Sequence, residues 1–401
     1  MSSLDHLRAL VFNDPNPAQS PHLAALLRAE SQVAKSIGES GGGSLLRSYL
    51  PAQPGATQGI LWETAASDRS TTLRTPSAPS PELQVTVRLR MEHVPTSVVH
   101  LMDASSQPLV TMSIQNHRQQ PARVRLRAQV EGYSAQAVET VAVEPAGKQE
   151  VGLLPTFFPD RTATFSDICR ATLHLSIDDL DGKTEQERTV PIWLLPRSSA
   201  ILYVQDPTTK TRNDLTPYLA AFVTPNAPSV LELLRQAASH IPSGMVASYQ
   251  VGVQGVQAQV EALYNTLRDA GLTYVNSVLY SGAVPGVLGQ RIRLPRESLA
   301  QRSANCIDGV VLFASLLESA SLNPAVVLVP GHALLGWETG EGSDEWDFLE
   351  TTLLGSAGFD SALQSGRSLA ESYRAVAASQ PEKFRLLSLR ELRTQRIWPM
   401  E

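Results

Sequence analysis

The chain has 401 residues, a hydrophobic fraction of 42%, a formal net charge of -6 at pH 7 and a pI near 5.8. This length predicts more than one domain, and the composition is that of an ordinary soluble globular protein. The acidic balance argues against nucleic acid as a direct partner, because phosphate binding needs a basic face. No apolar stretch approaches the roughly 20 residues that span a membrane, so we expect no membrane association.

The start of the chain and its two cysteines bear on the compartment. Met1–His6 lacks a basic segment followed by an apolar one, so we expect no signal peptide. Cys169 and Cys306 are far apart and show neither disulfide nor zinc spacing. We therefore expect a cytoplasmic, reduced protein without a metal or another cofactor.

Residues 1–82 are expected to be a helical appendage followed by a linker. Residues 22–30 can form one helix, and Gly41–Ser44 then interrupts the chain. Residues 64–82 are rich in Ser, Thr, Ala and Pro, a composition typical of linkers.

Residues 83–197 are expected to form an antiparallel β-sandwich of immunoglobulin type. Apolar and polar residues alternate there with the period of two that half-buried strands have, and turn signals separate the runs. Cys169 begins one run, where a small core residue is the favoured interpretation over a reactive thiol. The clearest runs are 85–89, 124–130, 173–177 and 190–194.

Residues 198–401 are expected to form an α+β domain. Helices are predicted by a proline-started segment, by an apolar stripe with helical spacing and by the apolar run after Cys306. A short strand is predicted from Tyr274, and β-branched runs predict further strands. In chain order, the expected helices are 227–237, 256–267, the one that begins near Cys306, and 360–378, and the later strands are 325–329, 332–337 and 345–350.

Cys306 and His332 predict the chemistry of a thiol enzyme. A thiol becomes nucleophilic when it loses its proton, and a helix N-terminus and a nearby imidazolium both favour the thiolate. His332 would accept that proton and later donate it to the leaving group, while backbone N–H groups at the helix start would hold an oxyanion. After residue 200 the only other histidine is His240, which precedes Ile241–Pro242 at a helix end and is better explained by a solvated or capping role.

A third residue should hold the imidazole in the right tautomer, and two acids are candidates. Asp347 and Glu350 lie three apart in an expected strand, so their side chains point to opposite faces. Strand parity alone does not choose between them.

Residues from about 270 to 355 resemble the transglutaminase-like superfamily of papain-type thiol enzymes. Arg302, Cys306 and the Leu316–Leu317 pair resemble its helix, and Gly331–Ala333 resembles its histidine segment. In that family a tryptophan stands four residues before an aspartate, which a small pair of residues follows. Here that pattern is Trp346, then Glu350 with Thr351–Thr352, so the resemblance implies that Glu350 rather than Asp347 orients His332.

Three departures from the family pattern concern the substrate. Ala304–Asn305 replaces the usual glycine before the cysteine, Leu334 replaces a frequent aromatic residue, and Ile307 replaces the tryptophan of animal cross-linking enzymes. The last change argues against a calcium-dependent cross-linker. The segment 290–295 with the other motifs is similar to a bacterial branch whose members often accompany helicase or nuclease modules in defence systems.

Six further residues are candidates for substrate binding or support of the site. Asp308 lies in the first turn of the predicted helix, where a surface acid that interacts with the helix dipole is the favoured interpretation. The arginines of 291–296 are too few for a nucleic-acid groove and favour a solvated or substrate-carboxylate role. The full set is Tyr274, Gln290, Asn305, Asp308, Trp346 and Asp347.

The sequence therefore predicts a cysteine hydrolase that acts on amide bonds, foremost a peptidase on a protein partner, with the sandwich docking that substrate or a regulatory protein. The first alternative is a glutamine transamidase or deamidase, which uses the same acyl-thioester. The second is a non-catalytic interaction module, against which the intact Cys306 and His332 speak. No feature of the sequence indicates an oligomeric state.

Overall fold

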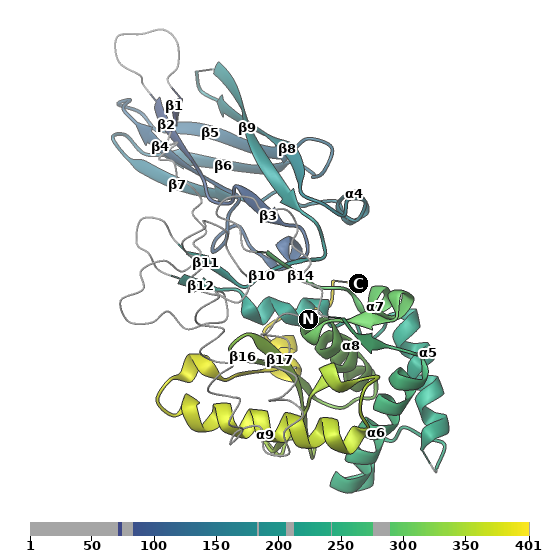
Figure 1. Cartoon of the computed structure of the whole chain (residues 1–401). Coiled ribbons are helices and arrows are strands. Elements are labelled where there is room, and N and C mark those ends of the chain that lie inside the picture. The colour runs from purple at the N-terminus through teal and green to yellow at the C-terminus, as the bar shows by residue number, and fades with distance from the viewer. Residues whose placement is uncertain are drawn as a thin grey trace, which may run out of the picture. The chain divides into compact units, whose positions relative to one another are not determined.

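The computed structural model describes residues 71–73, 83–182, 184–205, 212–241, 243–275 and 289–400. The chain divides into two compact units (Figure 1). The first holds the described residues up to Asp214 and Gly289, and the second holds those from Leu215 to Val275 and from Gln290 onward. The helix expected at 22–30 lies outside the described residues.

Two β-sheets make up most of the first unit. Their strand orders are β1-β2-β4-β7 and β3-β9-β8-β5-β6. Three short strands follow in the chain. The strands are β1 (Thr71–Leu73), β2 (Leu83–Leu89), β3 (His93–Pro95), β4 (Val110–Asn116), β5 (Ala122–Val130), β6 (Ala137–Val143), β7 (Lys148–Leu153), β8 (Cys169–Asp179), β9 (Thr184–Leu195), β10 (Ser199–Ile201), β11 (Tyr203–Gln205) and β12 (Arg212–Asp214), with the helices η2 (Val99–Leu101) and α4 (Pro159–Thr162).

The two sheets share one apolar core, and alternation along the strands produces it. In β5 the side chains of Val124 and Leu126 are buried, whereas those of Arg125 and Arg127 face outward. The buried residues of β5 and β8 belong to the same cluster as those of β2 and β4 from the other sheet. The period of two read from the sequence thus identifies the core face of these strands.

The expected boundaries and pairing of this region differ from the structure in three respects. β1 lies inside the stretch expected to be a linker, and it pairs antiparallel with β2. The compact unit continues to Asp214, beyond the expected end at residue 197. β3 pairs with β9 in parallel, although the expectation was antiparallel throughout. A strand of three residues carries too little periodicity to be recognised in the sequence.

The second unit mixes helices with a four-stranded sheet, which agrees with the expected α+β class. Its helices are η3 (Thr216–Phe222), α5 (Pro228–Ala237), η4 (Ala238–His240), η5 (Ser248–Val251), α6 (Gly252–Asp269), α7 (Pro295–Gln301), α8 (Cys306–Ser319), η6 (Thr351–Leu353), α9 (Phe359–Ala377), η7 (Pro381–Lys383) and α10 (Leu389–Thr394). Its strands are β13 (Thr273–Tyr274), β14 (Gly289–Arg291), β15 (Ser303–Ala304), β16 (Pro324–Val329), β17 (His332–Glu338), β18 (Trp346–Leu349) and β19 (Arg385–Ser388).

The sheet of this unit has the order β18-β17-β16-β19 and is antiparallel. Nearly every residue of β16 and β17 is buried, as expected of central strands covered on both faces. Helix α8 packs on β16 and β17, and α9 packs on β18 (Figure 1). Residues 307–317 of α8 are all buried, which explains why its sequence is apolar on every side.

Close packing of α9 on β18 depends on a glycine, and this leads to a stability prediction. A Cβ at Gly366 would lie 2.5 Å from the carbonyl oxygen of Phe348 and 2.7 Å from the backbone of Leu349. We expect Gly366→Ala to lower the free energy of unfolding by about 1–3 kcal/mol, as overpacking does. Gln364→Ala, at an exposed position of the same helix, is the control, and urea titration is the measurement. Stabilisation by Gly366→Ala, the usual effect of alanine in a helix, would contradict the contact.

Candidate functional site

Cys306 is the first residue of α8, and a reciprocal pair of hydrogen bonds starts the helix there. The Asn305 side chain accepts from the backbone N–H of Asp308 at 2.9 Å, and Asp308 Oδ2 accepts from the N–H of Asn305 at 3.2 Å. This capping box satisfies N–H groups that a helix start otherwise leaves without partners. The thiol is half-buried at this terminus.

His332 is the first residue of β17 and follows a tight turn from β16. Val329 and His332 are paired across the hairpin, so Pro330 and Gly331 form a two-residue turn. Gly331 has a φ of +75°, a conformation that glycine adopts without steric cost. The turn thereby places the imidazole at the end of the sheet, with 14% of its side chain exposed.

Glu350 contacts the imidazole directly. His332 Nε2 and Glu350 Oε2 are 2.7 Å apart. The other oxygen, Oε1, accepts from the backbone N–H of Thr352 at 3.0 Å and from its hydroxyl at 2.6 Å. The Glu350 side chain is 1% exposed, so Thr352 and His332 together hold a carboxylate that burial would otherwise make costly.

The electrostatics of the pair favour imidazolium and carboxylate. Burial lowers the pKa of His332, but the charge of Glu350 and hydrogen bonds with Cys306 and Glu350 outweigh it and raise that pKa to about 10. Burial raises the pKa of Glu350. The charge of His332, its hydrogen bond and the two hydrogen bonds from Thr352 outweigh burial and bring that pKa below its usual value. Each partner thus stabilises the charged form of the other.

Cys306 also acts on His332, since it is among the groups that raise the pKa of the imidazole. Because Nε2 of the imidazole faces Glu350, Nδ1 is the ring nitrogen left for the sulfur. The hydroxyl of Thr351 donates to the carbonyl oxygen of Cys306 at 3.4 Å, which links the segment after Glu350 to the helix start. Three residues that lie up to 44 positions apart are therefore brought together.

Asp347, the competing acid, faces a different partner. Its two oxygens accept from Nε and Nη2 of Arg367 in α9, at 2.6 and 2.5 Å. Trp346, its neighbour, packs with the apolar cluster that includes Ala370 of α9. The expected contact between Glu350 and His332 is therefore present, whereas Asp347 is bonded to Arg367 and Trp346 packs against the apolar cluster. A functional role of any of these residues is a proposal and is argued below.

Tyr274 and Gln290 lie on the short strands β13 and β14, which precede α8 in the chain. Tyr274 of β13 is paired with Ala304 of β15, which leads directly into Asn305. It lines a narrow pocket with eight other residues and is 40% exposed. Gln290 is half-buried in β14. Of the strand expected from Tyr274, the described residues include Tyr274 itself in β13, and the residues expected after Val275 lie outside the described part of the chain. The other residues that line the pocket are Leu267, Leu272, Thr273, Ala304, Gly309, Phe313, Thr351 and Leu354.

Asp308 and Arg293 correct two sequence-based interpretations. Asp308 is fully buried rather than a surface acid, and its Oδ2 accepts from Nη1 of Arg293 at 2.7 Å. Burial raises the pKa of Asp308 despite these partners. Arg293, expected to be solvated or to bind a substrate carboxylate, has only 8% of its side chain exposed. The sequence signal for this was weak, because Arg293 stands between Ile292 and Leu294, where alternation also permits an outward side chain.

Thr352 is the residue at the site that sequence reasoning did not assign a role. It was noted only as part of the small pair after Glu350, yet it bonds Oε1 of Glu350 through both its hydroxyl and its N–H. A threonine two residues after an acid is a common local capping pattern, which was the available signal.

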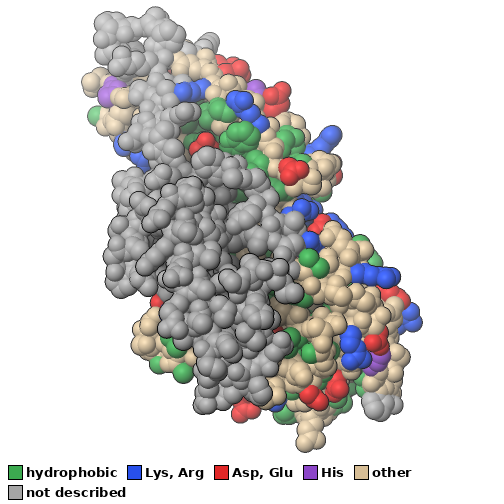
Figure 2. All heavy atoms as spheres, viewed as in Figure 1, with side chains coloured by type: hydrophobic (Ala, Val, Ile, Leu, Met, Phe, Trp, Pro, Cys, Tyr) green, Lys and Arg blue, Asp and Glu red, His purple; other side chains and the backbone are tan. Residues whose placement is uncertain are grey.

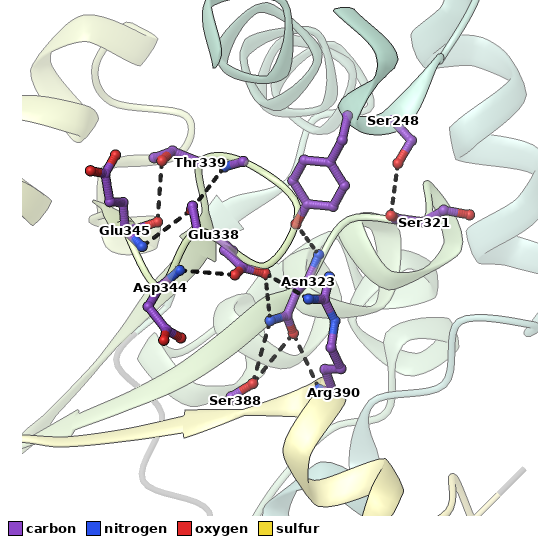
Figure 3. Close-up of polar contacts among 12 residues, drawn as sticks. Ser248, Ser321, Asn323, Glu338, Thr339, Asp344, Glu345, Ser388 and Arg390 are labelled. Carbon is purple, nitrogen blue, oxygen red and sulfur yellow. Dashed lines mark hydrogen bonds and ion pairs between the residues drawn. The ribbon is translucent and has the colours of Figure 1, made fainter. Parts of the chain in front are cut away.

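A second buried polar cluster lies at the opposite end of β17, six residues from His332. Asn323 Nδ2 donates to Glu338 Oε2 at 3.0 Å, and Arg390 Nη1 lies 3.1 Å from the same oxygen. The Asn323 N–H donates to the Tyr249 hydroxyl at 2.7 Å, and its Oδ1 accepts from the N–H of Arg390. Figure 3 shows these contacts joining the ends of β16, β17 and β19. The cluster anchors strand ends and contains neither a cysteine nor a histidine.

Comparisons with known proteins name no family for this chain. No protein-family model matches it, and no curated protein matches it. A crystal structure of a FixG-related protein from Vibrio parahaemolyticus matches with 18% identity over 29% of this chain and 98% of that chain. The TM-score is 0.20, too low to support a conclusion about fold or function.

Two features, a membrane-spanning helix and a cluster of metal ligands, are absent from the described residues. Within these residues, no helix combines the length and apolar character needed to cross a membrane. In the same part of the chain, no group of three or more His, Cys, Asp or Glu side chains is placed to hold a metal ion.

Proposed function

We propose that this protein is a cysteine hydrolase that cleaves amide bonds, foremost a peptidase acting on a protein. Cys306 is the nucleophile, His332 the general base and acid, and Glu350 the residue that orients the imidazole. The observation that carries the proposal is the bond of His332 to Glu350 at 2.7 Å, together with the contribution of Cys306 to the raised pKa of the same imidazole. This is the arrangement that activates a thiol: a nucleophile, a base and an acid in a connected series.

The proposed reaction has two steps. The Cys306 sulfur attacks the amide carbon, the C–N bond breaks, and His332 gives the proton to the departing amine. Water, with His332 accepting its proton, then attacks the thioester, releases the carboxylic acid and regenerates the thiol. If the amide is that of a glutamine side chain, ammonia is the departing amine. Water then converts the thioester to glutamate, which is deamidation, whereas an amine forms a new amide, which is transamidation, so both are alternative outcomes of the same type of intermediate.

The finer fold assignments belong to this proposal. The second unit is proposed to be a transglutaminase-like, papain-type domain, which is supported by the order of Cys306, His332 and Glu350 along α8, β17 and the end of β18. The first unit is proposed to be an immunoglobulin-like sandwich, which is supported by its two sheets around one core. We propose that it docks a protein substrate or regulator in a bacterial defence system.

The state of the cysteines and the distribution of charged side chains support a cytoplasmic protein with a protein partner. Both Cys169 and Cys306 are free thiols, as is usual in reducing compartments. On the face shown in Figure 2, the described Lys and Arg side chains lie among Asp and Glu side chains. A mixed surface of this kind favours protein contacts over a nucleic-acid backbone, which needs a concentrated basic area.

The test is selective alkylation of the two cysteines in the whole protein. Cys169 is the internal reference, because it is also half-buried and bonds only the Tyr133 hydroxyl, at 3.3 Å, and a neighbouring carbonyl. We expect iodoacetamide at pH 6 to modify Cys306 at least 10 times faster than Cys169, since a histidine-paired thiolate persists at a pH where ordinary thiols are protonated, a factor estimated from the general range of thiol reactivity. Peptide mass spectrometry measures both rates. Equal rates at the two positions would overturn the proposed activation of Cys306.

A further inference from the structure

A buried ion pair holds the helix start that carries Cys306. Asp308 Oδ1 accepts from the backbone N–H of Arg293 at 2.8 Å. Asp308 Oδ2 accepts from Arg293 Nη1 at 2.7 Å and from the N–H of Asn305 at 3.2 Å. The side chain of Arg293 is 8% exposed and that of Asp308 is 0% exposed. One carboxylate therefore binds both the cap residue of α8 and a segment 15 residues earlier in the chain.

Arg293 is itself fixed by its surroundings. Its Nε donates to Gln301 Oε1 in α7 at 2.8 Å, and its neighbours Ile292 and Leu294 are buried. The guanidinium thus joins three parts of the unit: residues 292–294, α7 and the first turn of α8. Cys306 lies between Asn305 and Asp308, so the same contacts determine where its backbone stands.

Stability alone gives a poor account of this arrangement. Burying two charges costs several kcal/mol of desolvation, and well-packed apolar residues of similar volume often stabilise a fold as much or more. An apolar pair would offer no acceptor for the N–H groups of Asn305 and Arg293. The first turn of α8 would then lack the hydrogen bonds that fix its position. A nucleophile needs placement to within a fraction of an ångström, because a small displacement can lower the rate 100-fold.

We propose that Arg293 and Asp308 are positioning residues that set the place of the Cys306 sulfur relative to the His332 ring. This inference rests on the proposed function of Cys306 and His332, and it assigns a role at the site to Arg293, which touches neither of them in the contacts described above. The pair acts through the capping box of α8. Arg293 orients Asp308, and Asp308 orients Asn305. The turn between Asn305 and Asp308 carries the thiol.

The test measures how Cys306 reacts when the ion pair is changed. Arg293→Met keeps the length of the side chain and removes its charge and donors, and Arg293→Lys keeps the charge. The second-order rate constant of iodoacetamide with Cys306 is measured at pH 6 and pH 8 by peptide mass spectrometry, with Cys169 as reference. We expect Arg293→Met to lower the rate at pH 6 by about 10-fold or more and Arg293→Lys to restore part of it.

The ratio of the rates at pH 8 and pH 6 separates positioning from general loosening. For a thiol with the usual pKa of about 8.5 this ratio is roughly 75, and for a thiolate already formed by a histidine it is near 1. The ratio in Arg293→Met should rise toward the first value, while Cys169 in the same sample keeps its own. An unchanged ratio and rate at Cys306 in folded Arg293→Met would overturn the proposal.

Two further variants keep the test decisive. Arg293→Met combined with Asp308→Asn removes both charges and retains an oxygen for the Asn305 N–H. The double variant should fold even if the single variant, which leaves a buried charge, does not. Its Cys306 should show the same loss of rate at pH 6. Arg367→Met removes another Arg–Asp ion pair of the same unit, that with Asp347, in which the arginine is half exposed, and should leave Cys306 unaffected. A wild-type Cys306 that reacts no faster than Cys169 would instead overturn the proposed function, so the two failures are distinguishable.

Discussion

Cys306→Ala is expected to abolish turnover while leaving the protein folded. Removal of a half-buried sulfur at a helix start leaves only a small void, so we expect the free energy of unfolding to change by less than about 1 kcal/mol. Covalent catalysis, by contrast, has no second nucleophile to replace the thiol. Thermal unfolding and hydrolysis of a panel of peptide and ester substrates are the two measurements.

The matched control is the other cysteine of the chain. Cys169→Ala removes a thiol that packs against the core of the first unit and contacts Tyr133. We expect this variant to retain full turnover, because Cys169 lies on β8 and belongs to the core of the two-sheet unit. Measurable turnover by Cys306→Ala, or its loss in Cys169→Ala, would refute the assignment of the nucleophile.

Glu350→Gln is expected to have the second largest effect, on both stability and turnover. Breaking a buried ion pair from one side costs about 3 kcal/mol, because the remaining partner loses its compensating charge. Turnover should fall less than in Cys306→Ala or in a variant of His332, since an imidazole without its acid still samples the productive orientation. Denaturant titration and turnover are measured on the same preparations.

The stability difference between wild type and Glu350→Gln should depend on pH. The pKa of His332 is raised from 6.5 to about 10, so its contribution is complete below pH 6.5 and is lost as pH rises through 10. The pKa of Glu350 is lowered from 4.5, so its contribution is present above pH 4.5 and is lost as pH falls through the lowered value. The difference should therefore be largest between pH 4.5 and 6.5 and shrink toward pH 10.

Asp347→Asn is the control for this experiment. Asp347 is paired with Arg367 of α9, whose side chain is half exposed, so its loss should cost less stability and leave turnover near that of the wild type. A larger loss of turnover in Asp347→Asn than in Glu350→Gln would show that the orienting acid has been assigned wrongly.

Local pattern was sufficient for much of the second unit. The apolar run after Cys306 predicted α8, and the turn signals at Gly331 and at 340–343 separated the strands that became β16, β17 and β18. These features depend on periodicity and on glycine, which act within a few residues. The order of Cys306, His332 and Glu350, to which we assign the proposed roles of nucleophile, base and acid, also requires only the sequence.

The choice between Asp347 and Glu350 shows where local pattern ends. Both were placed in one strand of residues 345–350, whereas β18 ends at Leu349 and Glu350 caps η6. Its side chain is directed by Thr352 and by the pairing with His332, so strand parity did not apply to it. The family resemblance, rather than periodicity, pointed to Glu350.

The sequence by itself determined the alternation that builds the first unit, the apolar helix after Cys306 and the residue types of the proposed site. Only the tertiary structure showed the contact of Glu350 with His332 that the resemblance had implied, and it alone decided that β1 joins the first unit and that Arg293 and Asp308 are buried together. The physical reason is that periodicity records which face of an element is apolar, whereas a contact between distant residues depends on how elements pack. A charged residue such as Arg293 is expected to be exposed when only the sequence is known, because its partner is not visible there. In this protein the partner is Asp308, 15 residues later in the chain and after α7.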